Sequence, residues 1–242
     1  MSTRPVSGRS LVASALSAAA DWLVEPAEAC DEGDHDHPAP PEAHPVVAVV
    51  GLSGRCGTTT VARAVGAQLG AREPGGACAV TAAILPGAVP LGMPAAARLA
   101  REVAPFIRGS VRACGRLCLI EDPNLESVAA AVRYLAPLVI DVDTRTEGAA
   151  AAAVADHVVL VGSPSTEPAL AALLGQTLGA VGPEPVTVLN RAGQDGERWT
   201  GRAELELPDS RMGARVALAG REPRGVLGRA VSELTARCGS AC

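Results

Sequence analysis

The chain of 242 residues carries a formal net charge of −5, and 48% of its residues are hydrophobic while only 2% are aromatic. All 21 basic residues are arginines, and no basic stripe offsets the acidic balance, which argues against a nucleic-acid-binding surface. No apolar run approaches the roughly 20 residues that cross a bilayer, so we expect no transmembrane segment. Leu11–Ala20 lacks the strongly hydrophobic centre of an export signal. These features predict a soluble protein of the cytoplasm.

The first 45 residues differ in composition from the rest of the chain. Residues 1–24 are predicted to form an N-terminal helical segment, with a helix at Ser10–Leu23. Residues 25–45, EPAEACDEGDHDHPAPPEAHP, are rich in acids, proline and histidine and lack large apolar side chains, which predicts a linker. Residues 46–242 are predicted to form the main domain.

The acid and histidine tract at residues 31–44 raises the question of a metal site, because such flexible tracts bind metals loosely. Its candidate ligands are Asp34, His35, Asp36, His37 and His44. A solvated spacer is the alternative interpretation, and the sequence leaves both open.

The seven cysteines are spread over a chain that is too large to need disulfide staples. Cys114 and Cys118 are four positions apart, as are Cys238 and Cys242. Neither pair has the two-residue gap of common zinc or redox motifs, so free thiols are the favoured interpretation over a metal site.

An alternation of short β-branched runs and helical stretches begins at residue 46. The predicted strands are Val46–Val50, Ala77–Leu85, Arg116–Ile120, Leu138–Val142, His157–Val161, Val186–Leu189 and Ala203–Leu207. The predicted helices are Thr59–Leu69, Pro94–Val103, Asn124–Leu135, Glu167–Leu178 and Gly225–Arg237. Continuous apolar strands separated by helices are typical of a parallel sheet that is buried on both faces. The pattern therefore predicts an α/β fold with a doubly wound, mainly parallel sheet, helices on both faces, and a site at the carboxyl ends of the strands.

The last predicted helix is amphipathic. Its apolar stripe is formed by Val226, Leu227, Ala230, Val231 and Leu234. Its polar face mixes Glu233 with Arg229 and Arg237, whereas a helix that lies on a membrane usually has a basic polar face. Packing against the core is therefore favoured.

The stretch VVAVVGLSGRCGTTTVARAVGAQL, residues 46–69, has the outline of a phosphate-binding loop between a strand and a helix. Glycines at positions 54 and 57 let the backbone curl so that successive N–H groups point at one anion, and the helix adds its dipole. In such loops a lysine contacts the β- and γ-phosphates, and a Ser or Thr hydroxyl holds Mg²⁺. Thr59 is placed for the magnesium ion, but Thr58 stands where the lysine would be.

This loop resembles that of the MinD/ParA group of P-loop ATPases, of the SIMIBI class, whose pattern is K-G-G-x-G-K-T-T. Residues 53–60, SGRCGTTT, align with it, so that Ser53 and Thr58 replace its two lysines and leave a degenerate Walker A loop. The segment LVIDVDT resembles the family's V-D-T-P-x-G switch strand, with Asp143 and Thr144 aligned and Arg145 in place of the proline.

Further segments extend the resemblance in the family's order. Residues 155–170, ADHVVLVGSPSTEPAL, resemble its A-D-x-x-x-L-V-x-x-P-x-x-x-S-L segment. VLNR, which ends in Asn190 and Arg191, matches the strand whose asparagine contacts adenine in relatives. ELPDS matches the place where the backbone around a proline, here Pro208, closes over the base.

The resemblance implies ATP and Mg²⁺ as cofactors. The nucleotide-binding residues that it implies are Gly54, Arg55, Cys56, Gly57, Thr58, Thr59, Thr60, Asn190, Arg191 and Pro208, with Thr59 and Asp143 at the metal. Losing one lysine removes a charge-assisted hydrogen bond and weakens binding about ten- to a hundredfold, while the backbone cradle remains. Arg55 is a candidate substitute, although a solvated loop arginine is the favoured interpretation.

We expect the loss of the family's charged groups to impair ATP hydrolysis more than ATP binding. Relatives carry an Asp-x-Asp after the second strand, but residues 77–101 hold no acid, so three charged groups of the family's machinery are absent. Transition-state charge needs fixed cations and a positioned water. We therefore expect weak or absent ATP hydrolysis, and the sequence assigns no catalytic residue.

Three functions are compatible with these residues to different degrees. The first is a MinD/ParA-like regulatory or positioning protein that binds ATP, forms a homodimer and acts on a protein partner. Within that family, the TadZ/CpaE proteins of pilus systems form a branch with degenerate loops. They also carry an extra N-terminal segment, which the first 45 residues of this chain resemble although they are much shorter than a full receiver domain. The alternative is a non-catalytic pseudo-ATPase scaffold that binds a protein partner without nucleotide. A metabolic P-loop enzyme such as an ATP-dependent ligase ranks last, because it would need the missing lysines and carboxylates.

A DNA-binding surface is a further hypothesis. Arg101, Arg108, Arg112 and Arg116 bunch within one region of the sequence. A solvated face is the commoner meaning of such a cluster, so we do not expect nucleic-acid binding.

Overall fold

The structure is a computed structural model of the chain, and it describes residues 42–81, 91–142, 145–192 and 194–239. The predicted N-terminal helical segment and most of the linker lie outside these residues, as do Asp143 and Thr144, and their assignments stay predictions. His44, at the end of the predicted linker, is described: its backbone N–H donates to the Arg133 carbonyl at 2.7 Å, and its Nδ1 lies 3.4 Å from Glu73 Oε2.

The described residues contain one eight-stranded sheet in the order β3-β4-β2-β5-β1-β6-β7-β8. The strands are β1 (Val46–Gly51), β2 (Cys78–Thr81), β3 (Ser110–Cys114), β4 (Leu117–Glu121), β5 (Leu138–Val142), β6 (His157–Gly162), β7 (Val186–Ala192) and β8 (Leu205–Pro208). Every neighbouring pair is parallel except β3 and β4, which are antiparallel. β1 is central: Val46 pairs with Leu138 of β5, and Val47 pairs with His157 of β6.

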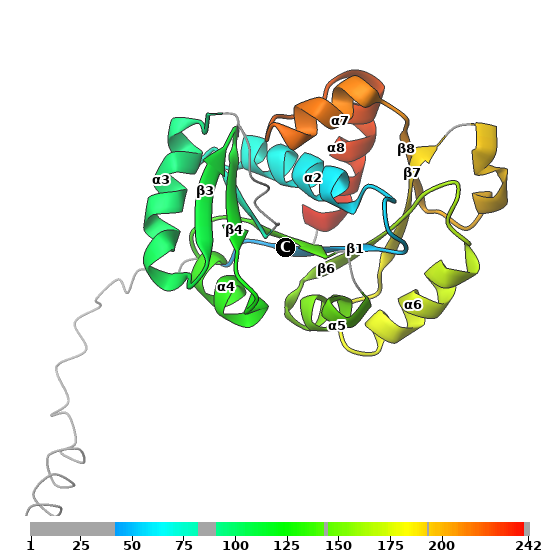
Figure 1. Cartoon of the computed structure of the whole chain (residues 1–242), viewed down its shortest axis with the longest axis horizontal. Helices are drawn as coiled ribbons and strands as arrows, with labels where there is room; N and C mark the ends of the chain where they lie inside the picture. The colour runs from blue at the N-terminus through cyan, green and yellow to red at the C-terminus, as the bar shows by residue number, and fades with distance from the viewer. Residues whose placement is uncertain (1–41, 82–90, 143–144, 193, 240–242) are drawn as a thin grey trace, which may run out of the picture. The chain divides into compact units, whose positions relative to one another are not determined.

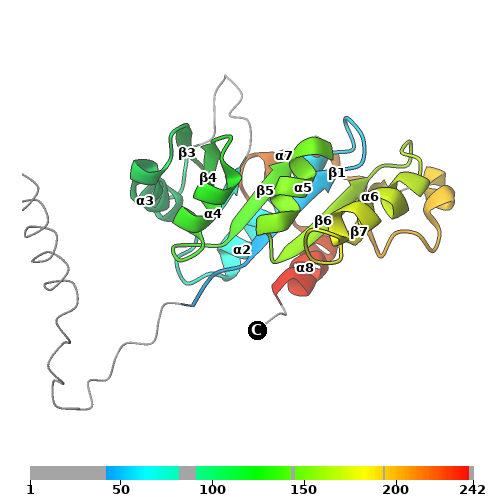
Figure 2. The same cartoon turned by 90° about the horizontal axis from the view of Figure 1, so that it is seen from below.

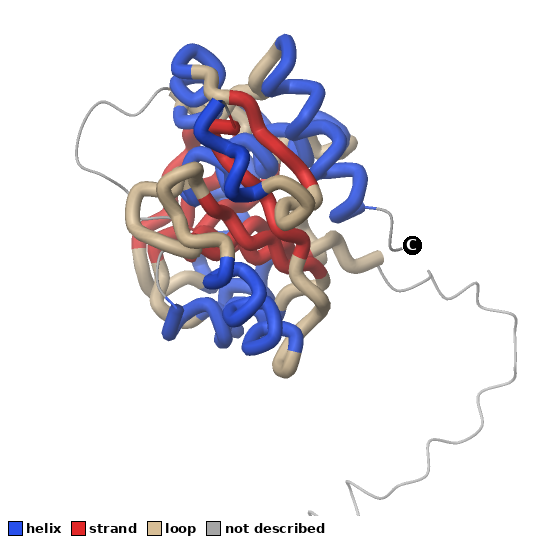
Figure 3. The backbone as a smooth tube through the Cα atoms, turned by 90° about the vertical axis from the view of Figure 1, so that its right-hand side faces the viewer, coloured by secondary structure: helices blue, strands red, loops and turns tan. Residues whose placement is uncertain are grey.

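In the part of the chain that the structure describes, seven α-helices cover the two faces of the sheet (Figures 1 and 3). They are α2 (Thr58–Arg72), α3 (Pro94–Val103), α4 (Leu125–Val132), α5 (Arg145–Val154), α6 (Ala169–Gly179), α7 (Arg211–Leu218) and α8 (Gly225–Gly239). Helices α2, α7 and α8 lie on one face, and α4, α5 and α6 lie on the other (Figure 1). None of the helices that the structure describes is long and apolar enough to span a bilayer.

The sequence of β1, VVAVVG, explains this two-layered core. All six residues are buried, and successive side chains of a strand point to opposite faces. Val47 and Val49 belong to the apolar cluster with α2 and α8, whereas Val46, Ala48 and Val50 belong to the cluster on the opposite face. A strand that packs against helices on both faces must be apolar at every position.

The predicted fold class is confirmed, with eight mostly parallel strands and helices on both faces. Three elements were missed: strand β3, helix α5 and helix α7. One predicted core residue was wrong, because Val226 is 61% exposed. The buried stripe of α8 consists instead of Leu227, Val231, Leu234 and Cys238, which recur every three to four residues, and Val226 lies off that line.

Candidate functional site

The predicted phosphate-binding loop lies at the carboxyl end of the central strand. It leaves β1 at Gly51, and the backbone N–H of Leu52 donates to Val161 of β6 at 2.9 Å, which ties the start of the loop to the sheet. Arg55 and Gly57 then adopt the left-handed conformation, with φ of 64° and 89°. Such turns make successive N–H groups converge on one side of the backbone. Figure 2 shows the loop, in blue after β1, at the same end of the sheet as the loop that follows β6.

Helix α2 begins without a side-chain cap. Its N-cap is Gly57, which offers no side chain, and its first turn holds no acid. The first bond of the helix runs from the N–H of Val61 to the Gly57 carbonyl at 3.0 Å. Within the described part of the chain, no acceptor pairs with the N–H groups of residues 57–60. A helix start with four unpaired donors and the positive end of the dipole is suited to an anion.

Thr58, which stands at the position of the family's phosphate lysine, points into the protein. It is 4% exposed, and its Oγ1 lies 3.2 Å from the Sγ of the buried Cys56. A Cβ added to Gly51 would clash with the same oxygen. The hydroxyl is therefore packed beneath the loop, and its side chain cannot replace the long reach of a lysine.

Ser53, at the position of the family's other lysine, also bonds within its own chain. Its Oγ lies 2.9 Å from Oγ1 of Thr166, which is 3% exposed in the loop between β6 and α6. That oxygen also accepts the backbone N–H of Ser163 at 3.1 Å and lies 3.0 Å from Ser163 Oγ. These hydroxyls tie the phosphate-binding loop to the loop after β6.

Asn190 supports the loop from β7. Its Nδ2 donates to the Cys56 carbonyl at 2.8 Å, and a Cβ on Gly57 would clash with that amide. Asn190 is 7% exposed. Removing this side chain would leave a buried carbonyl without its donor, so Asn190 holds the loop in shape whatever else it contacts.

Four of the residues that the resemblance implies for the nucleotide meet around one small pocket. Thr60, Asn190, Arg191 and Pro208 line a cavity of about 50 Å³ beside α2, together with Asp209 and Ser210 at the start of α7. Drug-sized ligand pockets have roughly 300–1,000 Å³. This cavity has the expected lining for a base-binding pocket, but in the present conformation it is too small for a purine.

The predicted magnesium ligands are only partly described. Thr59 is exposed in the first turn of α2, so its hydroxyl is accessible beside the loop, whereas Asp143 lies outside the described residues. Among the residues with described positions, no three His, Cys, Asp or Glu side chains are grouped as a metal site. Thr59 therefore fits a magnesium ligand, and the carboxylate that would join it is not among the groups the structure places.

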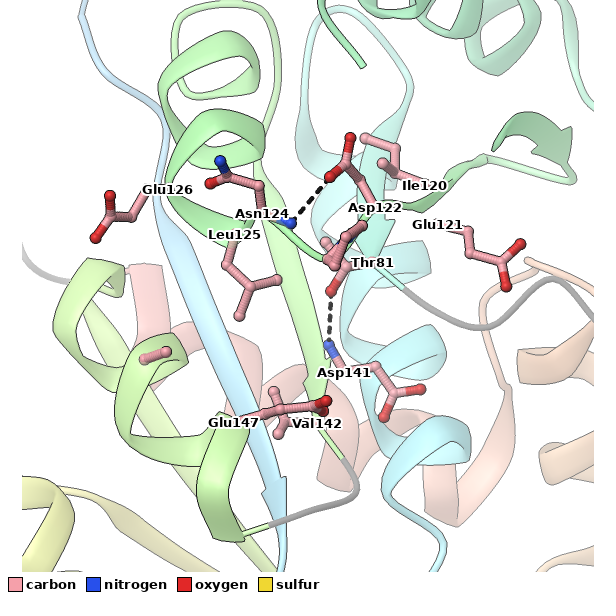
Figure 4. Close-up of a pocket in the computed structure, with 12 residues that line it drawn as sticks. Thr81, Ile120, Glu121, Asp122, Asn124, Leu125, Glu126, Asp141, Val142 and Glu147 are labelled. Atoms are coloured by element: carbon pink, nitrogen blue, oxygen red, sulfur yellow. Dashed lines mark hydrogen bonds between the residues drawn. The ribbon is translucent and has the colours of Figure 1, made fainter. Parts of the chain in front are cut away.

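A second pocket, the acidic pocket, was not predicted from the sequence. It has a volume of about 740 Å³ at the carboxyl ends of β2, β4 and β5, and five carboxylates of the described residues line it: Glu121, Asp122, Glu126, Asp141 and Glu147. Glu121 and Glu126 point away from each other in Figure 4, consistent with the lack of a metal-type cluster among the described residues. The two acids of the stretch LIED, Glu121 and Asp122 at the end of β4, could have indicated this pocket from the sequence, because sites form at the carboxyl ends of such strands.

Asp122 shows how the acidic pocket is held together. Its carboxylate accepts the backbone N–H groups of Asn124 at 2.9 Å, of Arg108 at 2.8 Å and of Gly109 at 3.3 Å. These bonds, that of Asn124 foremost, hold the pKa of Asp122 below its usual value. Asp122 is therefore a structural anchor between β3, β4 and α4.

The cysteines behave as core residues in the described part of the chain. Cys56, Cys78, Cys114, Cys118 and Cys238 are free and buried there. Burial raises the pKa of Cys118 to about 12 and that of Cys238 to about 11. Buried thiols with raised pKa values are poor nucleophiles and poor metal ligands, which agrees with the expectation of free thiols.

The eight-stranded, mainly parallel sheet with a glycine-containing loop between its central strand and α2 is the P-loop NTPase fold. No family model matches the sequence, and no curated protein matches it. Among solved structures, the chain is similar to a ParA family ATPase from Chlorobium tepidum TLS, with 15% identity, a TM-score of 0.56, and coverage of 80% of this chain and 98% of that one. It is also similar to the MinD cell division protein of Aquifex aeolicus, with 13% identity, a TM-score of 0.53, and coverage of 82% and 98%.

A third similar structure is apo McdA of Cyanthece, with 14% identity, a TM-score of 0.50, and coverage of 80% of this chain and 94% of that one. Identities this low establish the fold and not the activity. The fold is that of the MinD/ParA ATPases, and the resemblance found in the sequence is confirmed at this level.

Proposed function

We propose that this chain is a MinD/ParA-like regulatory or positioning protein that binds a nucleotide in the loop at residues 54–60 and hydrolyses it weakly or not at all. The observation that carries the proposal is the set of unpaired N–H groups at residues 57–60, at the carboxyl edge of a sheet with the MinD/ParA fold. Backbone donors and a helix dipole bind phosphate without any lysine, because they supply directed hydrogen bonds and positive potential at a fixed place.

The proposed cofactors are ATP and Mg²⁺. The proposed location of the protein is the cytoplasm, where ATP is abundant. Thr59 supplies a hydroxyl to the magnesium ion, and Asp143 is the proposed carboxylate that joins it. The bound ion neutralises phosphate charge. Asn190 and Pro208 are proposed to hold the base, which requires the small cavity that they line to widen on binding.

Weak hydrolysis follows from the groups around the loop. Thr58 is packed beneath it, and the side chain of Arg55 is exposed, with no ion pair among the described residues. β2 ends in Thr81, whose Oγ1 accepts the backbone N–H of Asp141 at 3.2 Å. Relatives carry an Asp-x-Asp after the second strand, whereas residues 77–101 of this chain hold no acid. We expect steady-state phosphate release well below about 1 s⁻¹, the lower end of ordinary enzyme rates, and a rate at or above that value would contradict this part of the proposal.

A protein partner and a homodimer complete the proposal. One similar structure is a complex of MinC with MinD from Aquifex aeolicus, at 14% identity and a TM-score of 0.52, so this fold is known to assemble with a second protein. In the present chain Ser53 replaces the lysine that the family extends across its dimer. Any dimer must therefore form without that contact.

The experiment that tests nucleotide binding is thermal unfolding of the full chain with increasing Mg-ADP or Mg-ATP. A ligand that binds only the folded state stabilises it by RT ln(1 + [L]/Kd), so a hundredfold excess over Kd adds about 2.7 kcal/mol. We expect the midpoint to rise with either nucleotide. A midpoint that stays constant up to millimolar concentrations would favour the second candidate.

The second candidate is a scaffold that keeps the fold and binds its partner without nucleotide. The cavity of about 50 Å³ favours it, because a purine does not fit there without movement. The absence of both lysines agrees with it as well. The unpaired N–H groups of α2 are what it leaves unexplained, and for that reason it ranks second.

A further inference from the structure

An arginine from a neighbouring strand stands beside the phosphate-binding loop. Arg191 belongs to β7, and the ladder between β7 and β8 shifts register between Asn190 and Ala192, which makes Arg191 the extra residue of a β-bulge. Its φ is 60°, a left-handed conformation that residues other than glycine rarely adopt. Bulges turn a side chain away from its place in the ladder, and strained backbone of this kind gathers at functional sites.

The bulge brings the guanidinium of Arg191 to the loop. A Cβ built on Gly57 would lie 3.8 Å from Arg191 Nη2. Arg191 also lines the small cavity with Thr60 and Pro208. Arg191 is therefore close both to the pocket proposed for the base and to Gly57, the N-cap of α2. The phosphate nearest the ribose would pass between these two places.

The charge of Arg191 is not neutralised by the residues that the structure describes. Asp209 lines the same cavity, yet no ion pair within 4.0 Å joins Arg191 to any described carboxylate. By contrast, Arg116 and Arg198 each pair with a glutamate. An arginine with an unpaired charge, placed next to unpaired N–H donors, is suited to an anionic ligand.

We propose that Arg191 supplies, from β7, the positive charge that Thr58 cannot supply from within the loop, and that it contacts the phosphate nearest the ribose. The inference rests on the nucleotide binding proposed above. That phosphate is common to ADP and ATP, so Arg191 raises the affinity for both by the same factor. The site then discriminates little between the two nucleotides, unlike a loop whose lysine contacts the β- and γ-phosphates.

The test is calorimetric titration of the full chain with Mg-ADP and with Mg-ATP. Arg191→Ala and Arg191→Gly both remove the guanidinium, but glycine relieves the left-handed backbone while alanine keeps its strain. Arg191→Lys keeps the charge, and Arg202→Ala is the control, because Arg202 is exposed and its side chain makes no ion pair among the described residues. We expect the alanine and glycine variants to lose about ten- to a hundredfold in affinity for both nucleotides, with lysine restoring part of it.

Three results would overturn the inference. Wild-type affinity in both Arg191→Ala and Arg191→Gly would show that the guanidinium contributes nothing. A loss confined to ATP would place the contact at the terminal phosphate instead. No heat from the wild type at millimolar nucleotide would remove the proposed function and this inference together, whereas the first two results remove the inference alone.

Discussion

Two regions share the carboxyl edge of the sheet and differ in volume and charge. The loop region, at the ends of β1, β6 and β7, has a cavity of only about 50 Å³, and its polar groups are backbone N–H groups, hydroxyls, Asn190, Arg191 and one carboxylate, that of Asp209. The acidic pocket, at the ends of β2, β4 and β5, has about 740 Å³; the described residues that line it include five carboxylates and no arginine. The larger cavity is thus the wrong one for a phosphate, because like charges at short range repel.

Cavity volume is a poor guide to the proposed anion site in this fold. In the loop region the backbone itself is the proposed ligand-binding group, so the proposed site depends on a few left-handed residues and on the side chains that hold the loop. In the acidic pocket the backbone N–H groups near Asp122 are already used by its carboxylate. Unpaired donors, and not empty space, mark the place where we propose that phosphate binds.

The largest effect on nucleotide binding is expected for Gly57→Ala, which changes the loop region alone. An added Cβ would clash with Asn190 Nδ2, and a φ of 89° disfavours any side chain. We expect nucleotide-dependent stabilisation to disappear. Gly75→Ala, outside the loop, is the matched control, because nothing lies within 4 Å of its Cβ and its φ is not positive. Equal thermal shifts in both variants and the wild type would show that the loop does not bind the nucleotide.

A smaller effect, on stability, is expected from one substitution made in each region. In Asn190→Asp, the donor that reaches the Cys56 carbonyl becomes an anion facing it. In Asn124→Asp, the acceptor that caps α4 is kept, because Asn124 Oδ1 accepts the N–H of Ser127 at 3.0 Å. We expect the first to lower the free energy of unfolding by about 1–3 kcal/mol and the second to leave it nearly unchanged.

Urea unfolding followed by circular dichroism measures both variants on the same scale. Equal losses for Asn190→Asp and Asn124→Asp would contradict the assignment of one asparagine as donor and the other as acceptor. A loss confined to Asn124→Asp would reverse it.

The smallest effect concerns the acidic pocket and depends on pH. Hydrogen bonds from backbone N–H groups, that of Asn124 foremost, lower the pKa of Asp122 in the folded protein. A carboxyl with a lowered folded pKa stabilises the fold above its unfolded pKa of about 3.9, and this contribution is lost as the pH falls through the folded pKa. We expect Asp122→Asn to cost less than about 1 kcal/mol at pH 6, because the group is near the surface.

That difference should shrink in urea titrations as the pH falls below about 4. Glu184→Gln is the control, since Glu184 is exposed and forms no ion pair among the described residues. A difference between wild type and Asp122→Asn that grew toward acid would contradict the assigned direction of the pKa shift.

Most of the sheet was predictable because its strands carry an unbroken apolar pattern. Leu138–Val142 was predicted with both of its ends, and β1, β4 and β6 were predicted to within one residue at each end. β3 was missed because it is an edge strand with exposed positions, including Arg112, and so lacks that pattern. α7 was missed although its N-cap, Ser210, was a visible signal: Ser210 Oγ accepts the N–H of Gly213 at 3.1 Å.

The loop was predictable from its glycines and threonines, but its side-chain directions were not. The inward turn of Thr58 depends on Gly51 and Cys56, and the position of Arg191 depends on a bulge between two strands. The acidic pocket gathers carboxylates from β4, β5, α4 and α5, which lie apart in the sequence. Such arrangements follow from how strands and helices are placed next to one another, and sequence spacing does not reveal them.

The most direct measurement is calorimetric titration of the wild-type chain with Mg-ADP, because the central claim is that backbone donors at the start of α2 hold a phosphate without a lysine. We expect a saturable heat with one site per chain at submillimolar to millimolar nucleotide. A flat titration through that range, from a chain shown to be folded by circular dichroism, would contradict it.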